Sequence, residues 1–389
     1  PSSPNDDDVH AAVAWLDADR QVQGAKKAAK VGSRRAGEGV VCVCVLHDGL
    51  PQSLALPKGV GEKMVVKEEA QGAGMSLDSP PQAAIVEVNC ETDFVGKNPI
   101  FQELVRDLAH TSAVFPALGG AVTNTSGKEV MQEINIQDFL AFPLFSSSPE
   151  SSSSSASKPK LVSEAIIDAI SRLGENIMLS RACALSPTSS SLPNQSDGMM
   201  RIVSSFGHGG SSSTTSSSSG GPTAVQAAQG YSMTMGKVGS LLVTRFPRKL
   251  EEIDGAAAGK AMRGLTRSLS RQAAGMKTTS ISSSTSLTAV EADERSEELY
   301  KQPFMMLLPA ARPPVAAAAE EAETLDNSQA VGGVLQAWSQ AMYSGQKGSG
   351  EVRVEEMRRG ELGETLEAKE ESGNGGRFAE EVRRAAGLV

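Results

Sequence analysis

The chain has 389 residues, of which 39 % are hydrophobic and only 4 % aromatic, and its formal net charge is −9. A chain of this length can bury two modest hydrophobic cores. The acidic balance argues against nucleic-acid binding, which needs Lys and Arg clustered over an extended surface. No run approaches the roughly 20 apolar residues that span a bilayer, so we expect no membrane partner either.

The four cysteines, Cys42, Cys44, Cys90 and Cys183, lie mostly within apolar runs. Their spacing fits neither a disulfide framework nor a zinc site, and a reducing compartment is the simplest interpretation. Cys42 and Cys44 would share one face of a strand, where packing is the commoner role. None of the four histidines is paired with Cys or Asp at metal-ligand spacing. We therefore expect no metal and no other cofactor.

Two helix-like segments open the chain. In residues 9–16, apolar side chains recur at helical spacing after Asp8, a candidate N-cap. Residues 24–35, reading GAKKAAKVGSRR, contain good helix formers. A solvated basic helix is favoured for this segment over a nucleic-acid patch, because the whole chain is acidic.

Strand and helix signals then alternate through the first half. The apolar, β-branched run 40–46 predicts a buried strand, and 84–88 predicts its antiparallel neighbour beyond a long loop. Asn98 and Pro99 provide an N-cap and a first helical position for a helix that continues to residue 110. The remaining signals are an amphipathic helix at 161–173, ended by Gly174, and a strand-like run at 177–185.

The second half repeats this pattern. Strands are predicted at 200–204 and 238–245, helices at 250–271 and 331–340, and a closing strand at 352–357. Each half then has the order β, β, α, α, β, which indicates two related modules. Serine-rich stretches near 145–157 and 207–221 have too little apolar content to order themselves and are interpreted as insertions.

The sequence therefore predicts an α+β fold with two related modules, each a small antiparallel sheet with packed helices, after a residual N-terminal helical segment. The predicted boundaries are 1–39 for the N-terminal helical remnant and its basic linker, 40–185 for the first core module with insertions at 47–81 and 145–160, 186–222 for a strand and Ser/Gly-rich linker, and 223–389 for the second core module with an interrupted helical hairpin region.

Signatures of catalysis are missing from the sequence. The closest approach to a phosphate-binding loop is GAAAGK at 255–260, which is one residue short and is followed by Ala261 where a metal-binding hydroxyl would be needed. No G-x-S-x-G elbow occurs, and no nucleophile is accompanied by a base. We therefore expect a protein that is not an enzyme and that acts through a protein partner.

The most informative segment is IVEVNCETDFVGK at 85–97, where a strand runs into Thr92, Asp93, Phe94 and Val95. It resembles the signature of the elongation factor Ts family, VEVNCETDFV followed by K-N and a helix. Further segments resemble the family in its own order: 13–40, RLGENIMLSRA at 172–182, FGHG at 206–209, KVGSLLV at 237–243, QPF at 302–304, and 327–335.

The resemblance implies a non-enzymatic guanine-nucleotide exchange factor that binds elongation factor Tu and promotes GDP release during translation elongation. It also implies the residues that contact this partner, namely Thr92, Asp93, Phe94, Val95, Leu173, Gly174 and His208. Phe94 would insert as a wedge beside the Mg²⁺-side helix of the GTPase. A scaffold or chaperone-like binder of elongation factor Tu without efficient exchange is the alternative.

Five of the implied contact residues also have a plainer interpretation. Phe94 could pack beneath its own helix, and Asp93 could be an ordinary helix N-cap. Leu173 and Gly174 could be no more than a helix end, and His208 could be an exposed loop residue. Because the resemblance extends over an unbroken string around Phe94, it favours the wedge.

The sequence also departs from the family pattern. We take most of the family's opening segment, with its ubiquitin-associated-like helical domain, to be missing here, and the hairpin expected at 250–298 is interrupted by TTSISSSTS. The insertions resemble those of organellar members. We expect the mitochondrial matrix as the location, with the plastid as the alternative.

Overall fold

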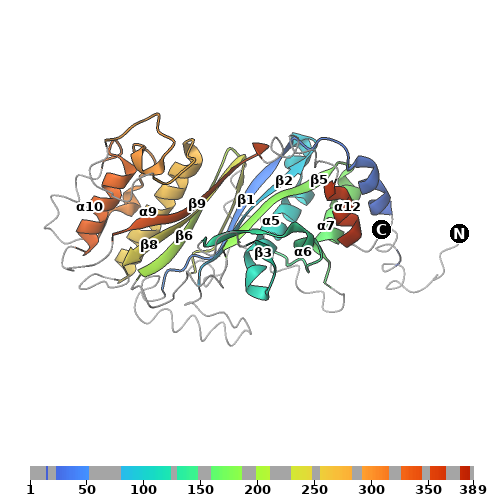
Figure 1. The fold of residues 1–389 in the computed structure, drawn as a ribbon, viewed down its shortest axis with the longest axis horizontal. Coiled ribbons are helices and arrows are strands. Elements are labelled where there is room, and N and C mark those ends of the chain that lie inside the picture. The colour runs from blue at the N-terminus through green and yellow to red at the C-terminus, as the bar shows by residue number, and fades with distance from the viewer. Residues whose placement is uncertain are drawn as a thin grey trace.

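A computed structural model of the protein describes residues 15, 23–51, 80–123, 129–147, 159–185, 199–210, 229–247, 255–282, 291–314, 326–343, 351–364 and 377–385. Two antiparallel sheets pack against each other, and each is covered by helices on its outer face (Figure 1). The predicted α+β class is confirmed. The predicted helix at 9–16 and the insertions fall largely outside the described residues.

The first sheet has six strands in the order β3-β4-β5-β2-β1-β7, and every neighbouring pair is antiparallel. Its strands are β1 (Glu38–His47), β2 (Gln82–Cys90), β3 (Val122–Thr123), β4 (Met131–Ile134), β5 (Ile177–Leu185) and β7 (Ser232–Gly236). The predicted pairing of β1 with β2 is confirmed, and so is the strand at 177–185.

The β-branched run of β1 is buried on both faces because each face meets a different layer. Cys42 and Cys44 point toward the helices, whereas Val41 and Val43 point toward the second sheet. This alternation follows from the two-residue period of a strand. It explains why the sequence of β1 reads as an uninterrupted apolar run rather than as alternating apolar and polar residues.

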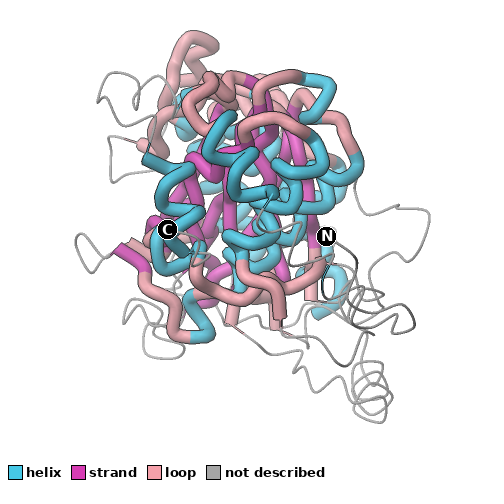
Figure 2. Tube along the Cα trace, turned by 90° about the vertical axis from the view of Figure 1, so that its right-hand side faces the viewer, coloured by secondary structure: helices cyan, strands magenta, loops and turns pink. Residues whose placement is uncertain are grey.

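Helices cover the outer face of the first sheet, as the view from the side of α7 and α12 shows (Figure 2). They are α4 (Asp93–Gly96), α5 (Pro99–Val114), α6 (Ile136–Leu140), α7 (Val162–Leu173), α12 (Arg377–Ala385) and the short 3-10 turn η1 (Pro116–Leu118). Asn98 caps α5 as predicted, since its side chain accepts a 2.9 Å hydrogen bond from the backbone N–H of Ile100.

The second sheet has three strands, in the order β6 (Met199–His208), β8 (Val238–Pro247) and β9 (Arg353–Glu361). Its outer face carries α9 (Gly255–Gly275), α10 (Val331–Tyr343) and the 3-10 turns η3 (Leu299–Lys301) and η4 (Pro309–Ala311). Trp338 is fully buried here and donates a 2.6 Å hydrogen bond from Nε1 to the carbonyl oxygen of Ala311.

The predicted equivalence of the two halves holds only in part. The first sheet has six strands and the second has three, and β7 belongs to the first sheet although it lies in the second half of the sequence. The last helix, α12, also packs against α6 and α7, with Phe378 and Val382 buried in the first core. Two elements from the second half of the sequence, β7 and α12, therefore pack with elements of the first half. The predicted domain boundaries remain a prediction.

The basic face predicted near the start of the chain is present in the structure. The basic segment 24–35 is helical over residues 23–31, with Ala28 and Val31 buried and the lysines at 26, 27 and 30 exposed, as expected for a solvated basic face. Among the described helices, none combines the length and the apolar character that crossing a membrane requires.

Candidate functional site

The predicted partner-contact residues lie where strand ends meet at one end of the two sheets. In the strand register Glu38 pairs with Cys90, and Cys90 pairs with Ile177. The end of β2, the beginning of β1 and the beginning of β5 therefore lie side by side. β7 ends at Gly236 along the same end of β1, directly before β8 begins. We call this end of the molecule, marked by Glu38, Cys90, Ile177 and Gly236, the corner end.

Residues 92–95, the TDFV corner, form the turn from β2 into α4. Thr92 is the N-cap of α4, with an extended backbone and a side chain that accepts a 3.4 Å hydrogen bond from the N–H of Val95. The Cys90 thiol donates a 3.2 Å hydrogen bond to the Thr92 carbonyl oxygen. Val95 is buried in the first core and anchors the helix. The hydrogen bonds of Thr92 and the buried side chain of Val95 therefore hold the TDFV corner in place.

Phe94 projects away from this anchored turn. Its side chain is 84 % exposed, which makes it the most exposed of the large hydrophobic residues in the described part of the chain. The interpretation in which Phe94 packs beneath its own helix is therefore wrong. An exposed aromatic ring on a turn whose neighbour Val95 is buried has the character of a binding anchor rather than of a core residue.

Asp93 is the first residue of α4 rather than its N-cap, so that interpretation is wrong as well. The cap position falls to Thr92 because Asp93 already has helical geometry. The Asp93 carboxylate accepts a 2.7 Å hydrogen bond from Lys97 Nζ, one helical turn further along. This hydrogen bond and the charge of Lys97 lower the pKa of Asp93, so the carboxylate is ionised at neutral pH.

Leu173 and Gly174 end α7 beside the TDFV corner. Gly174 adopts a left-handed conformation with φ of 80°, which residues with a Cβ rarely adopt, and its N–H bonds the carbonyl oxygen of Ile170. The next residue, Glu175, reaches across to Thr92 and accepts hydrogen bonds from its backbone N–H at 3.0 Å and from its hydroxyl at 2.7 Å. The structure therefore brings the helix end and the TDFV corner together.

Glu91 makes a similar contact, from the turn after β2 to the residue before β5. Its carboxylate accepts a 2.7 Å hydrogen bond from the backbone N–H of Asn176, and it also pairs with Arg34 at 3.5 Å. Sequence analysis missed both Glu91 and Glu175. The available signal was their position, since Glu91 directly follows the end of β2 and Glu175 lies two residues before β5, near strand ends where backbone N–H groups lack strand partners.

His208 lies at the end of β6, exposed and opposite Val238 in the strand register. The adjoining Lys237 forms a 2.7 Å ion pair with Glu38 at the start of β1. The charge of Lys237 also lowers the pKa of Asp93, though less than Lys97 does. His208 thus lies at the corner end, opposite the residue that follows Lys237.

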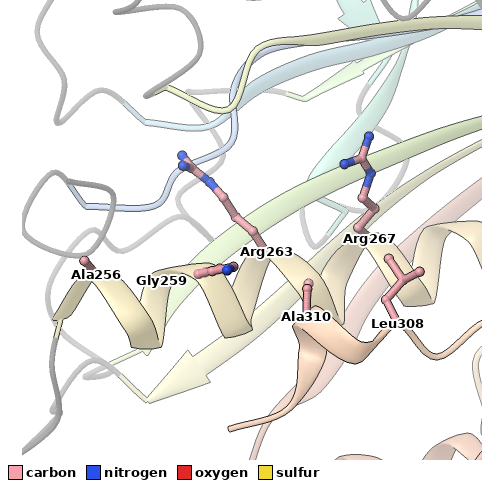
Figure 3. Close-up of a pocket in the computed structure, with 8 residues that line it drawn as sticks. Ala256, Gly259, Arg263, Arg267, Leu308 and Ala310 are labelled. Atoms are coloured by element: carbon pink, nitrogen blue, oxygen red, sulfur yellow. The ribbon is translucent and has the colours of Figure 1, made fainter. Parts of the chain in front are cut away.

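A cavity of about 320 Å³ lies elsewhere, along α9. Its lining includes Lys260, Arg263 and Arg267 from the helix and Leu308 and Ala310 from the neighbouring turn (Figure 3). The GAAAGK segment belongs to α9, so it is helical and does not form a phosphate-binding loop. Arg263 pairs with Asp48, just beyond the end of β1, roughly 30 Å of strand away from Glu38.

The described residues offer no cluster of three or more His, Cys, Asp and Glu side chains suited to a metal ion. All four cysteines are buried and free. Burial raises the pKa of the Cys42 thiol to about 12 and that of the Cys44 thiol well above its usual value. These thiols are therefore protonated at neutral pH, which suits packing rather than metal binding or nucleophilic attack.

An exposed aromatic ring on a turn held by hydrogen bonds, on an α+β scaffold, is the kind of anchor that proteins which bind other proteins present. No protein-family model matches the chain. The chain is 42 % identical over 400 residues to the mitochondrial elongation factor Ts of Mycosarcoma maydis, an alignment that covers all of this chain and 83 % of that protein. The protein of the same name from Malassezia globosa is 34 % identical, with 100 % and 87 % covered.

A third relative, the mitochondrial elongation factor Ts of Coprinopsis cinerea, is 30 % identical over 369 residues, which cover 94 % of this chain and 86 % of that protein. The chain belongs to the elongation factor Ts family. The resemblance drawn from the string at 85–97 is thereby confirmed.

Proposed function

We propose that this chain is a guanine-nucleotide exchange factor that binds elongation factor Tu in translation elongation and promotes GDP release by inserting Phe94. Membership of the elongation factor Ts family supports the exchange role. The observation that carries the mechanism is Phe94 itself, 84 % exposed on a turn whose neighbour Val95 is buried. No covalent bond is made or broken in this role.

Exchange of this kind follows from reciprocal linkage between two ligands of one protein. A factor that binds the nucleotide-free GTPase more tightly than the GDP-bound form must weaken GDP binding by the same ratio. GDP is held largely through charge-assisted contacts to its phosphates and its Mg²⁺. A side chain that displaces the elements making those contacts therefore lowers GDP affinity, without touching the nucleotide.

The surroundings of Phe94 suit such insertion. A phenyl ring has few rotatable bonds, and the turn that carries it is already ordered, so little conformational entropy is lost on docking. Around it stand the exposed pairs Asp93–Lys97 and Glu38–Lys237. We include Thr92, Val95, Leu173, Gly174 and His208 in the docking surface as supports or contacts, and the two lysines as candidates for pairing with acidic groups of the partner.

The test is release of a fluorescent GDP analogue from elongation factor Tu, followed by stopped flow. The wild-type chain should accelerate release, and Phe94→Ala should lose most of the acceleration while unfolding at the same denaturant concentration. Leu118→Ala is the matched control, because Leu118 is 57 % exposed on η1, beyond the far end of α5. This control should accelerate release as the wild type does.

Two other outcomes would change the assignment. If the wild-type chain binds elongation factor Tu in a pull-down but leaves GDP release unchanged, the scaffold function replaces the exchange function. If Leu118→Ala and Phe94→Ala lose activity equally, the wedge is not at the TDFV corner. Both outcomes are read from the same set of purified variants.

We further propose the mitochondrial matrix as the site of action. The three relatives described above are named as mitochondrial proteins, which supports this location over the plastid. The buried free cysteines suit a reducing interior. Fractionation of cells expressing the tagged full-length gene product would test the proposal, and recovery in a fraction other than mitochondria would overturn it.

A further inference from the structure

We infer that Glu175 is a positioning residue that sets the orientation of Phe94 by holding the Thr92 cap from the neighbouring turn. This inference rests on the proposed function, because it assigns to Glu175 an effect on exchange. Glu175 lies outside the TDFV corner and follows the left-handed Gly174 that ends α7. It acts through Thr92 and is not itself placed against the partner.

The contact uses both oxygens of the Glu175 carboxylate. Oε2 accepts the backbone N–H of Thr92 at 3.0 Å, and Oε1 accepts the Thr92 hydroxyl at 2.7 Å. The two bonds fix the Thr92 backbone and side chain at once. Both are hydrogen bonds to carboxylate oxygens, and the pair engages the backbone and the side chain of one residue.

The hydrogen bond from the Thr92 hydroxyl to Glu175 also determines how the Thr92 oxygen caps α4. A hydroxyl has one proton to donate and lone pairs with which to accept. Because its proton is directed at Glu175, the oxygen presents a lone pair to the N–H of Val95, 3.4 Å away. Without Glu175 the proton can rotate toward other acceptors, and this long capping bond loses its alignment. α4 has only four residues, so its cap accounts for much of its order.

The reciprocal bond from Asn176 N–H to Glu91 shows that the two turns are latched in both directions. Glu91 closes the turn after β2 onto β5, and Glu175 closes the turn after α7 onto α4. Segments 83 residues apart in sequence are thereby joined at the surface. Through the two Glu175 bonds the Leu173–Gly174 helix end and Phe94 form one ordered surface, whereas the Glu91 bond joins the strand ends and does not touch the Thr92 cap.

The latch is separable from the stability of the fold. Val95 and the strands β2 and β5 are buried independently of Glu175, which is itself half-buried at the rim. Removal of the carboxylate should therefore loosen the TDFV corner without unfolding the core. A positioning role predicts a fall in the exchange rate at saturating factor, because a loosened ring still docks but less often reaches its productive orientation.

The experiment compares Glu175→Ala with Glu91→Ala, which removes the reciprocal carboxylate and leaves the Thr92 cap in place. We expect Glu175→Ala to lower the saturating rate of GDP-analogue release about tenfold, and Glu91→Ala to lower it less than twofold. Thr92→Ser, which keeps the hydroxyl, should retain the rate, whereas Thr92→Val should lose it. Thr92→Val combined with Glu175→Ala should be no slower than the slower single variant, because the two changes break one contact.

Amide hydrogen exchange provides a readout that does not depend on the proposed function. Glu175→Ala should speed exchange at Thr92 and Val95 at least tenfold, while the amides of β2 and β5 keep their wild-type rates. Unchanged exchange at Thr92 and Val95 would overturn the latch whatever the GTPase assay gives. If Phe94→Ala abolishes nucleotide release but Glu175→Ala does not slow it, the positioning role fails while the exchange function stands.

Discussion

The two ends of β1 carry ion pairs of opposite character. At the corner end, Glu38 pairs with Lys237 and Asp93 pairs with Lys97, and all four side chains are at least 43 % exposed. At the far end, Asp48 pairs with Arg263, and the Asp48 side chain is only 6 % exposed. The two ends therefore use the same kind of ion pair, between a carboxylate and a Lys or Arg, in different ways. Exposed pairs contribute little to stability and are free to exchange partners, whereas a buried pair joins structural elements.

The far end is a structural joint between the two sheets. Asp48 accepts bonds from Arg263 Nε at 2.6 Å and Nη2 at 3.2 Å, and from the N–H of Leu50 at 3.0 Å. The backbone N–H of Asp48 also donates a hydrogen bond to the carbonyl oxygen of Gln229, and the Asp48 carbonyl oxygen accepts one from the N–H of Val203. Both partners lie in the second half of the sequence. This end therefore joins the two sheets, while the ion pairs of the corner end stay exposed.

Asp48→Ala is the change with the largest expected effect on stability. It leaves the half-buried Arg263 without this carboxylate and the Leu50 N–H without its acceptor, so we expect a loss of about 2–3 kcal/mol in the free energy of unfolding. Urea denaturation followed by circular dichroism measures it. Asp93→Ala is the control from the exposed end and should leave the midpoint unchanged. Equal midpoints for both variants would remove the distinction between the ends.

Local signals in the sequence were sufficient for the elements that frame the corner end. The β-branched run of β1, the Asn98–Pro99 start of α5 and the glycine that ends α7 each depend on neighbours along the chain, and all three are present. The order of strands was harder. β7 is a five-residue strand whose position beside β1 depends on residues almost 200 positions away, and its sequence, SMTMG, has no strong period.

The candidate site was predictable to a similar degree. The string around Phe94 identified the TDFV corner, and the exposure of the ring agrees with a surface role. The latch through Glu175 and Glu91 was not predictable, because an acid after a glycine or a strand has many possible acceptor roles. Only the tertiary approach of α7 to β2 brings Glu175 within reach of Thr92.

A smaller effect is expected from Gly174→Ala, which tests how firmly the corner end is built. The new Cβ would have room, since its nearest neighbours lie 3.5 Å or more away, so only the left-handed backbone opposes the change. We expect a loss of about 1 kcal/mol in the free energy of unfolding. Differential scanning calorimetry would measure it. A loss as large as that of Asp48→Ala would mean that the corner end is as structural as the far end.

The smallest effect concerns pH and His110, which lies on α5 away from the corner end. Burial lowers the pKa of His110, so the folded state favours the neutral ring. Because the folded pKa lies below the unfolded value of about 6.5, the contribution to stability is complete above that pH and is lost as pH falls through the folded pKa. Urea midpoints of the wild type should therefore decline between pH 7 and 5, and His110→Gln should reduce that decline. Parallel pH profiles would mean that the acid sensitivity arises at groups other than His110.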